Sequence, residues 1–240
     1  MNHRPAIFIL AFSALTSLHA DTAAIQPVNV TSTEHADLAP GGTIHVKDSF
    51  GSLTIEGWDQ PGVELTVVKS LGYTSKPAAT TTQLLDAVHV TMGRQSGTEL
   101  TISTTRPESR SFTHPLRKGT EVTLEYHIRA PRNSHLVINH AGGDVSVTGM
   151  TGDIEATSRR GDIVLMLPDL AKYSIDAHTK LGLVTSDAAA ATRRRFSPSE
   201  NLIQGGASAS RRLKLRMGFG GIEIKELPHE AVTPAFAGTN

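Results

Sequence analysis

The chain has 240 residues, of which 38% are hydrophobic and 5% aromatic, and it contains 21 Gly, 12 Pro and no Cys. Lys and Arg together number 23, as do Asp and Glu, so no global field attracts nucleic acid or an anionic membrane. The lack of Cys excludes disulfide scaffolds, thiolate metal sites, cysteine nucleophiles and the lipidated Cys of a bacterial lipoprotein.

The first 20 residues have the composition of a secretory signal peptide. A short basic start that contains Arg4 precedes an apolar run over residues 5–18, and Ala20 leads into a polar sequence. The apolar run is shorter than the roughly 20 residues that a bilayer crossing needs. We therefore expect cleavage after Ala20, export of residues 21–240, and no transmembrane segment in the mature protein.

Apolar pairs whose members are two residues apart recur every nine residues. Val145/Val147 follows a Gly-Asp dipeptide, and so do the two pairs after it. Alternation with a period of two predicts half-buried strands, and Gly beside Asp suits a tight corner. We therefore predict an all-β fold in which each nine-residue unit forms one strand and one corner. The other pairs in this pattern are Ile44/Val46, Leu53/Ile55, Leu136/Ile138, Ile154/Ala156, Ile163/Leu165, Leu213/Leu215 and Ile222/Ile224.

Nine residues of strand are too few to enclose a packed interior, so two units are expected to make a rung of roughly 18 residues. Stacked rungs would form a single-domain β-solenoid or β-roll, with continuous rows of buried aliphatic side chains. The alternative is a β-sandwich, because strands at intervals of roughly 8–12 residues are also typical of that fold. The strict period favours the solenoid.

The remaining segments complete one predicted domain. Helical spacing is limited to residues 82–88 and 188–195. Polar, Pro- and Gly-containing composition predicts a hairpin loop and a longer, partly disordered excursion from the repeat. The predicted boundaries are a signal peptide at 1–20, an N-terminal segment leading into the first strands at 21–42, the β-solenoid domain at 43–227 with its loop at 105–120 and its excursion at 186–210, and a flexible tail at 228–240.

Three segments in order resemble a bacterial family of putative adhesins, which are envelope proteins built of β-strand repeats. The segments are residues 51–59 with their Gly-Trp-Asp sequence, residues 126–131 with the Gly-Asp repeats that follow, and residues 213–224. The resemblance covers roughly residues 43–226. It implies a β-solenoid-like fold and an envelope or secreted location, and it implies no catalytic residues because none are established for the family.

Asp144, Asp153 and Asp162 occupy the same position in successive units. One interpretation is calcium bound at the corners, and the other is that these side chains form the corners by bonding to nearby amides. Calcium-binding β-rolls use a denser Gly-Gly-x-Gly-x-Asp pattern, so we expect corner-forming Asp and no metal or cofactor. The His residues of the repeat region have no spacing typical of zinc sites; they are His127, His135, His140 and His178.

Basic residues are concentrated near the C-terminus, where seven fall within 24 positions against a single Glu200. Apolar residues alternate with the last of these cations, so the charges are expected to face solvent and to discourage strand pairing at an edge. The alternative is docking to an acidic polysaccharide, lipopolysaccharide or a membrane surface. The absence of interleaved aromatic residues argues against nucleic acid. The seven are Arg193, Arg194, Arg195, Arg211, Arg212, Lys214 and Arg216.

No catalytic motif is evident. The sequence contains neither Gly-x-Ser-x-Gly nor a phosphate-binding Gly-x-x-x-x-Gly-Lys loop. Trp58 is the one Trp, and Tyr73, Tyr126 and Tyr173 are the three Tyr, which is little aromatic surface for stacking sugars. An enzyme that acts on polysaccharides is the alternative from another class. It predicts a groove lined by two or more carboxylates with aromatic walls.

We therefore expect a non-enzymatic, exported, adhesin-like protein that acts as an interaction or surface-binding module in the periplasm or at the cell surface. The sequence specifies neither catalytic residues nor a binding site. Envelope polysaccharide, lipopolysaccharide and another envelope protein are all compatible partners. A structural or regulatory periplasmic protein is a further alternative.

Overall fold

The computed structural model describes residues 28–71, 78–106, 122–188, 192–196, 199–205 and 209–228. The predicted signal peptide, most of the 105–120 loop, parts of the 186–210 excursion and the tail from residue 229 lie outside these ranges. Within them, turns and loops connect the strands, and the helices are the short α1 (Ala78–Asp86) and the 3-10 helix η1 (Leu170–Lys172). The prediction of an all-β fold is confirmed.

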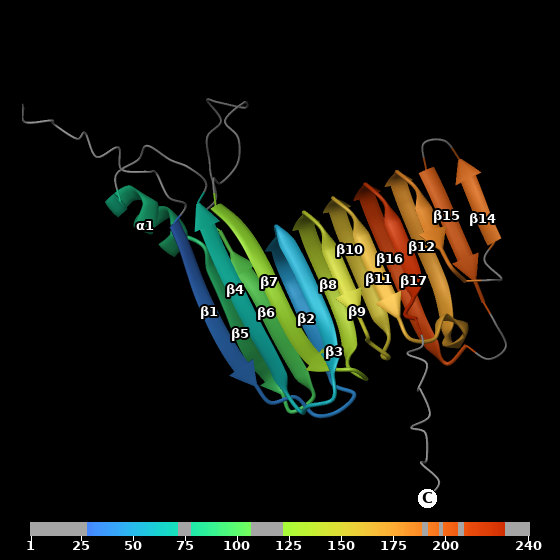
Figure 1. Ribbon diagram of the computed structural model, residues 1–240, viewed down its shortest axis with the longest axis horizontal. Coiled ribbons are helices and arrows are strands. Elements are labelled where there is room, and N and C mark those ends of the chain that lie inside the picture. Colours follow the sequence, from blue (N-terminus) through green and yellow to red (C-terminus); the bar gives the residue numbers. More distant parts are fainter. Residues whose placement is uncertain are drawn as a thin grey trace, which may run out of the picture.

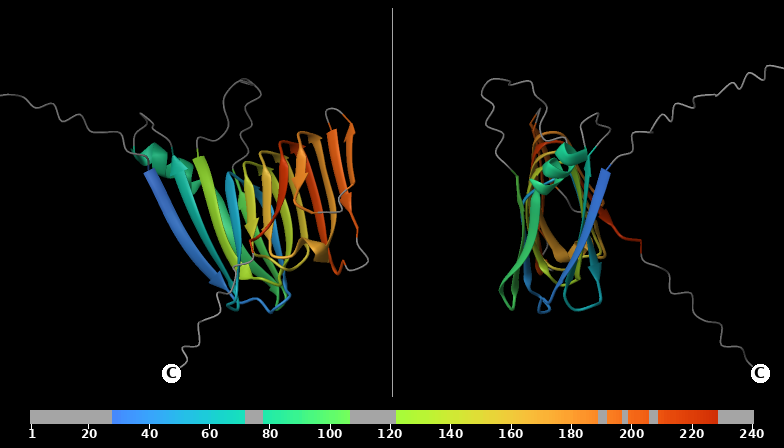
Figure 2. Two further views of the ribbon diagram at one scale, coloured as in Figure 1. Left: turned by 45° about the vertical axis from the view of Figure 1, so that its right-hand side comes forward. Right: turned by 90° about the vertical axis from the view of Figure 1, so that its left-hand side faces the viewer.

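Two mixed sheets face each other and enclose the core (Figures 1 and 2). Sheet A has the order β1 (Val28–Ala36), β4 (Val63–Leu71), β7 (Val122–Pro131), β3 (Ser52–Trp58), β9 (Val145–Thr148), β11 (Ile163–Leu167), β17 (Ile222–Glu226) and β13 (Val184–Ser186). Sheet B has the order β14 (Thr192–Phe196), β15 (Ser199–Gln204), β12 (Tyr173–Leu181), β16 (Arg211–Phe219), β10 (Ile154–Arg160), β8 (His135–Gly142), β2 (Thr43–Phe50), β6 (Glu99–Thr105) and β5 (His89–Ser96).

The nine-residue unit forms one strand and one corner, as predicted. The chain alternates between the sheets, so that β8 and β10 belong to sheet B while β9 and β11 belong to sheet A. Parallel neighbours are in register at an interval of two units, with Leu136 beside Ile154 and Val145 beside Ile163. All eight predicted apolar pairs are buried between the sheets, because the alternation turns every second side chain inward.

The prediction of a β-solenoid holds for the all-β class only, and the overall arrangement is sandwich-like, as in the alternative, with sheets that do not close. The rung β16–β17 is inserted between β10–β11 and β12–β13, so the stack does not follow chain order. The outer strands are antiparallel: β1 pairs with β4, β5 with β6, and β15 with both β12 and β14. Because β15 occupies one edge of β12, β16 lies at the other edge.

A ladder of glycines forms the corner that joins sheet B to sheet A. At Gly161, φ is +108°, and a Cβ atom would lie 2.1 Å from the carbonyl oxygen of Gly143 in the next rung. Only glycine tolerates both the backbone conformation and this close approach. The ladder follows the spatial order of the rungs rather than the chain order, and its members are Gly51, Gly143, Gly161, Gly220 and Gly182.

Helix prediction was confirmed at one segment and wrong at the other. Helix α1 lies beside β4 at one end of the molecule and overlaps the predicted 82–88 segment, where Leu85 is buried against the core (Figure 1). The predicted helix at 188–195 does not form across its second half, because residues 192–196 are strand β14, which pairs with β15. The described parts of the 186–210 segment therefore include two strands of sheet B, β14 and β15.

Candidate functional site

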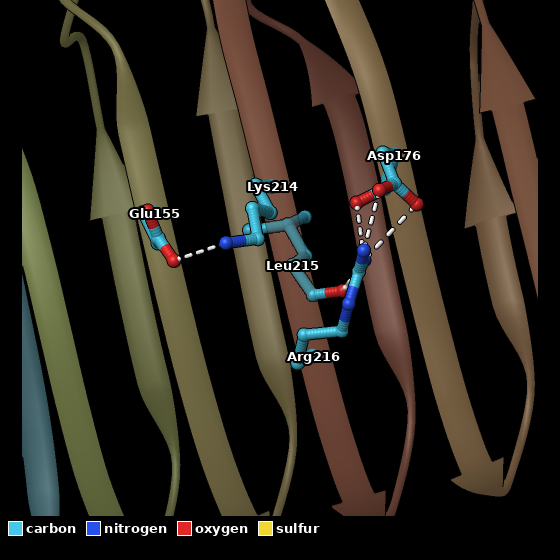
Figure 3. Close-up of polar contacts among 5 residues, drawn as sticks. All are labelled: Glu155, Asp176, Lys214, Leu215 and Arg216. Atoms are coloured by element: carbon cyan, nitrogen blue, oxygen red, sulfur yellow. Dashed lines mark hydrogen bonds and ion pairs between the residues drawn. The ribbon is translucent and has the colours of Figure 1, made fainter.

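The C-terminal basic residues on β16 form ion pairs with neighbouring strands (Figure 3). The Nζ atom of Lys214 lies 2.6 Å from an Oε atom of Glu155 on β10, and the guanidinium of Arg216 contacts the Asp176 carboxylate on β12. The solvent-facing orientation predicted from the alternation is correct, since Leu213 and Leu215 are buried. Because acidic residues on both sides offset these charges, the strand is not a bare cationic stripe.

Arg211 and the three arginines at 193–195 have different surroundings. The guanidinium of Arg211 lies 5.8 Å from the ring centroid of the buried Tyr173, within reach of a cation–π contact. Residues 193–195 belong to the outermost strand of sheet B, in agreement with their predicted place at an edge. Their side chains lie outside the described part of the structure.

The Asp row forms corners, as one of the two interpretations predicted. Asp144 accepts a hydrogen bond from the backbone N–H of Asp162 at 3.0 Å, and Asp162 accepts one from Gly221 at 2.7 Å. Asp153, on the opposite edge, accepts the N–H of Arg212 at 2.9 Å. Each carboxylate thus satisfies an amide of the neighbouring rung. Among the described residues, His, Asp and Glu form no group of three that could hold a metal ion.

The four predicted histidines do not come together. His140 is completely buried in β8, and its Nδ1 lies 2.8 Å from the Ser49 hydroxyl. Burial lowers the pKa of His140, while backbone groups of the adjacent glycines and the Asp144 carboxylate partly oppose this. His135 lies 3.7 Å from Asp153, His127 lines a hollow on sheet A, and His178 is half-buried on β12. Sequence reasoning gave no signal for the Ser49–His140 contact.

A network of side-chain hydrogen bonds surrounds Trp58, at the end of β3. The indole N–H donates to the carbonyl of Gly62 at 3.2 Å, which fixes the half-buried ring against the turn that follows. Gly57 directly precedes Trp58, and a Cβ atom on it would lie 2.4 Å from the carbonyl oxygen of Gly149. This position must therefore be glycine for the backbone segments at residues 57 and 149 to approach each other. The Gly-Trp-Asp sequence is therefore a structural unit.

Arg132 connects this unit to the turn after β7. Its Nε donates to Asp59 Oδ1 at 2.7 Å, a second nitrogen lies 3.4 Å from Oδ2, and a third donates to the Gly149 carbonyl at 3.2 Å. The hydrogen bonds from Arg132 lower the pKa of Asp59. Parallel pairing of β3 with β7 places Trp58 opposite Pro131 and brings this arginine to Asp59.

Three hollows are connected in a row by shared lining residues, and Trp58 lines two of them; we refer to them together as the Trp58 groove. The first, of about 370 Å³, is lined by Pro40, Trp58, Asp59, Gln60, Pro61, Pro131, Arg132 and Asn133. The second, of about 440 Å³, is lined by His35, Ala36, Asp37, Trp58, Gln60, Pro61, Gly62, Val63, Glu64 and Arg94. The third, of about 270 Å³, is lined by Thr54, Glu56, Glu64, Thr66, His127, Ile128 and Arg129.

The hollows form an extended surface because neighbours share residues. Trp58, Gln60 and Pro61 separate the first from the second, and Glu64 belongs to both the second and the third. The surface runs from the loops at the end of β3 onto the outer face of sheet A. An elongated partner fits this shape better than a compact one.

The acidic residues of the Trp58 groove are paired with cations. Asp37 lies 3.1 Å from Arg94, and Arg129 lies 3.5 Å from Glu64 and 3.7 Å from Glu56. The enzyme alternative predicted two carboxylates beside an aromatic wall, and Asp37, Glu64 and Trp58 do line one hollow. Hydrolysis of glycosides also needs one carboxyl group whose pKa is raised, and the shift found here, at Asp59, is in the opposite direction.

Comparisons with known proteins found matches among solved structures only. No protein-family model matches the sequence, and no curated protein matches it. A structure described as a putative cell adhesion protein from Clostridium sporogenes ATCC 15579 is 10% identical over 82% of this chain and 100% of that chain, with a TM-score of 0.48.

Two further solved structures have lower TM-scores. A putative adhesin from Bacteroides fragilis NCTC 9343 is 11% identical over 84% of this chain and 100% of that chain, with a TM-score of 0.24. A putative lipid binding protein from Parabacteroides distasonis ATCC 8503 is 10% identical over 82% and 97%, with a TM-score of 0.24. The structural neighbours are thus largely bacterial adhesins by description, at low sequence identity. Similarity at this level does not assign a function to this chain.

In the part of the chain that the structure describes, no helix combines the length and the apolarity needed to cross a bilayer.

Proposed function

We propose that this chain is an exported, non-enzymatic binding module that attaches to a component of the bacterial envelope through the Trp58 groove. The observation that carries the proposal is the convergence of Trp58, Asp59 and Arg132 at the junction of adjoining hollows on the outer surface. In the described part of the chain, mainly aliphatic side chains pack together between the sheets.

Two further observations support binding rather than catalysis. The carboxylates Asp37, Asp59 and Glu64 are all paired with arginine. At Asp59 this pairing lowers the pKa of the carboxyl group, which disfavours its use as a proton donor. The segment 51–59, which carries part of the resemblance to the adhesin family, ends with Trp58 and Asp59 at the centre of the groove.

Export is part of the proposal and rests on the signal-peptide pattern of residues 1–20. We also propose the domain boundaries that the sequence predicts, with one folded domain over residues 43–227 and a flexible tail at 228–240. Strand β1 lies within the preceding segment 21–42 and extends sheet A.

Retention of the mature chain on isolated envelopes of the source bacterium tests the proposal. Residues 21–240 would be mixed with washed envelopes and sedimented, and the supernatant would be assayed for released reducing sugar. We expect saturable co-sedimentation without a rise in reducing ends. Failure to sediment contradicts the binding function, and a time-dependent rise in reducing ends would establish the enzyme alternative instead.

A further inference from the structure

Trp58 is the one residue that offers a large aromatic surface within the groove. It lines two of the hollows, and its indole N–H is already bonded to the Gly62 carbonyl. Pro40, Pro61 and Pro131 add apolar, rigid surface around it. A ligand that meets this region must therefore present a flat apolar face of its own, as the C–H face of a pyranose ring does.

Polar groups that can bond to hydroxyls surround the same apolar surface. Asp59 and Arg132 hold each other in a two-point ion pair, yet their side chains are 82% and 43% exposed. Each therefore keeps hydrogen-bonding capacity on its solvent side. Gln60 and Asn133, both exposed, line the same hollow and supply side-chain amides. The apolar surface of Trp58 and the prolines can contact the C–H face of a sugar ring, while the surrounding polar side chains can bond to its hydroxyl groups.

The charge of the groove indicates which kind of sugar fits. Arg94, Arg129 and Arg132 are offset by Asp37, Glu64 and Asp59 at distances between 2.7 and 3.5 Å. Glu56 adds a further carboxylate beside Arg129. Because the cations are already neutralised, an acidic sugar would gain little from them and would be repelled by the neighbouring carboxylates.

We propose that the Trp58 groove binds a neutral polysaccharide chain, with one sugar ring packed on the Trp58 indole and its hydroxyl groups bonded to Asp59, Arg132 and the flanking amides. The adjoining hollows would hold the next sugar units along the chain. This inference rests on the proposed function and specifies the ligand of the same surface.

The single Trp makes the binding directly observable. Polysaccharide from isolated envelopes would be separated into neutral and acidic fractions by anion exchange, and each would be titrated into residues 21–240 while indole emission is recorded. Because Trp58 is the sole source of this signal, a change reports contact at the groove itself. We expect a saturable shift with the neutral fraction and none with the acidic fraction.

Matched variants locate the contact. Asp59→Asn breaks the Asp59–Arg132 pair, and Glu155→Gln breaks the Glu155–Lys214 pair, which is also exposed, on sheet B. We expect Asp59→Asn to weaken the apparent affinity about tenfold and Glu155→Gln to leave it unchanged. Trp58→Phe, followed by co-sedimentation because it lacks the reporter, should weaken binding by a similar factor.

The outcomes separate this inference from the proposed function. If neither fraction alters the emission while the chain still sediments with envelopes, the glycan inference is overturned and the binding function stands. A shift with the acidic fraction overturns the assignment to neutral sugar. If Asp59→Asn and Glu155→Gln weaken the apparent affinity equally, the assignment of the binding site to the Trp58 groove is overturned. If the chain neither sediments nor responds, both the inference and the function fail.

Discussion

Single residues at the corners decide whether the two sheets can stack. Each corner glycine packs its backbone against a carbonyl group of a neighbouring rung. Each corner Asp accepts a hydrogen bond from a backbone N–H group of a neighbouring rung. The Gly-Asp dipeptide thus combines close approach with hydrogen-bond satisfaction of a backbone group. This explains why the dipeptide recurs with the nine-residue unit, whereas the residues that face solvent vary.

Replacing Gly161 by Ala should destabilise the protein strongly. The new Cβ would lie 2.1 Å from the Gly143 carbonyl oxygen, and φ at this position is +108°. Crowding and backbone strain together should cost roughly 3 kcal/mol in the free energy of unfolding, measured by urea denaturation. Gly93→Ala is the matched control, because no atom lies within 4 Å of its Cβ position. An equal loss of unfolding free energy in the two variants would contradict the proposed role of the glycine ladder.

Because His140 is buried, the free energy of unfolding should decrease as the pH is lowered below the pKa of a histidine in the unfolded chain. Its pKa in the folded state lies below the ordinary value of 6.5, so the unfolded chain binds more protons below about that pH. The contribution of neutral His140 is fully present above pH 6.5 and is lost as the pH falls toward the folded pKa. Urea unfolding at pH 8, 7, 6 and 5 measures this slope.

In His140→Gln the pH slope over this range should be shallower than in the natural protein, because the titrating group is gone. Ser49→Ala should lower stability at pH 8 by about 1–3 kcal/mol, since it leaves the buried ring nitrogen without its hydroxyl partner. A pH slope in His140→Gln as steep as that of the natural protein would show that another group is responsible.

At the scale of elements, local patterns predicted the strands and the neighbours two units apart, but not the neighbours that are distant in the sequence. The alternation in Ile154–Ala156 or Leu213–Leu215 is visible in a few residues, so both strands could be predicted. Their adjacency in sheet B could not, because 59 residues separate the paired positions Ile154 and Leu213. Residues 188–195 were predicted as helix from their Ala and Arg content, and pairing of β14 with β15 overrides that preference.

The candidate site shows the same limit. Trp58 and Asp59 were conspicuous in the sequence as part of the Gly-Trp-Asp segment. Arg132 had no motif of its own, and only the parallel register of β3 with β7 brings it beside Asp59. The ion pairs of Lys214 and Arg216 were missed for this reason as well, since their partners lie on two other strands.

The basic residues of the excursion should not carry envelope binding. Strand β14 is at the far end of sheet B from β5, whereas the Trp58 groove includes residues of β1, β3 and β4 near the other end (Figure 1). The triple substitution of residues 193–195 by Ala should leave co-sedimentation with envelopes unchanged. Loss of co-sedimentation in a variant that unfolds at the same urea concentration as the natural protein would move the binding surface to β14.

At the scale of the whole molecule, the two packed sheets act as a rigid frame that holds the loops at the end of β3. The parallel centre of the stack is buried and regular, and the loops that form the groove connect strands on both sheets. Because the frame is filled with side chains, binding is expected to involve its outer surface and to leave the arrangement of strands unchanged.

Hydrogen exchange of the mature chain, free and bound to isolated envelopes, tests this account most directly. Binding at the Trp58 groove predicts new protection of backbone amides in residues 57–64 and 131–134, with the strands β12 and β16 unaffected. Protection confined to residues 192–216, or absent throughout the chain in the bound state, would contradict it.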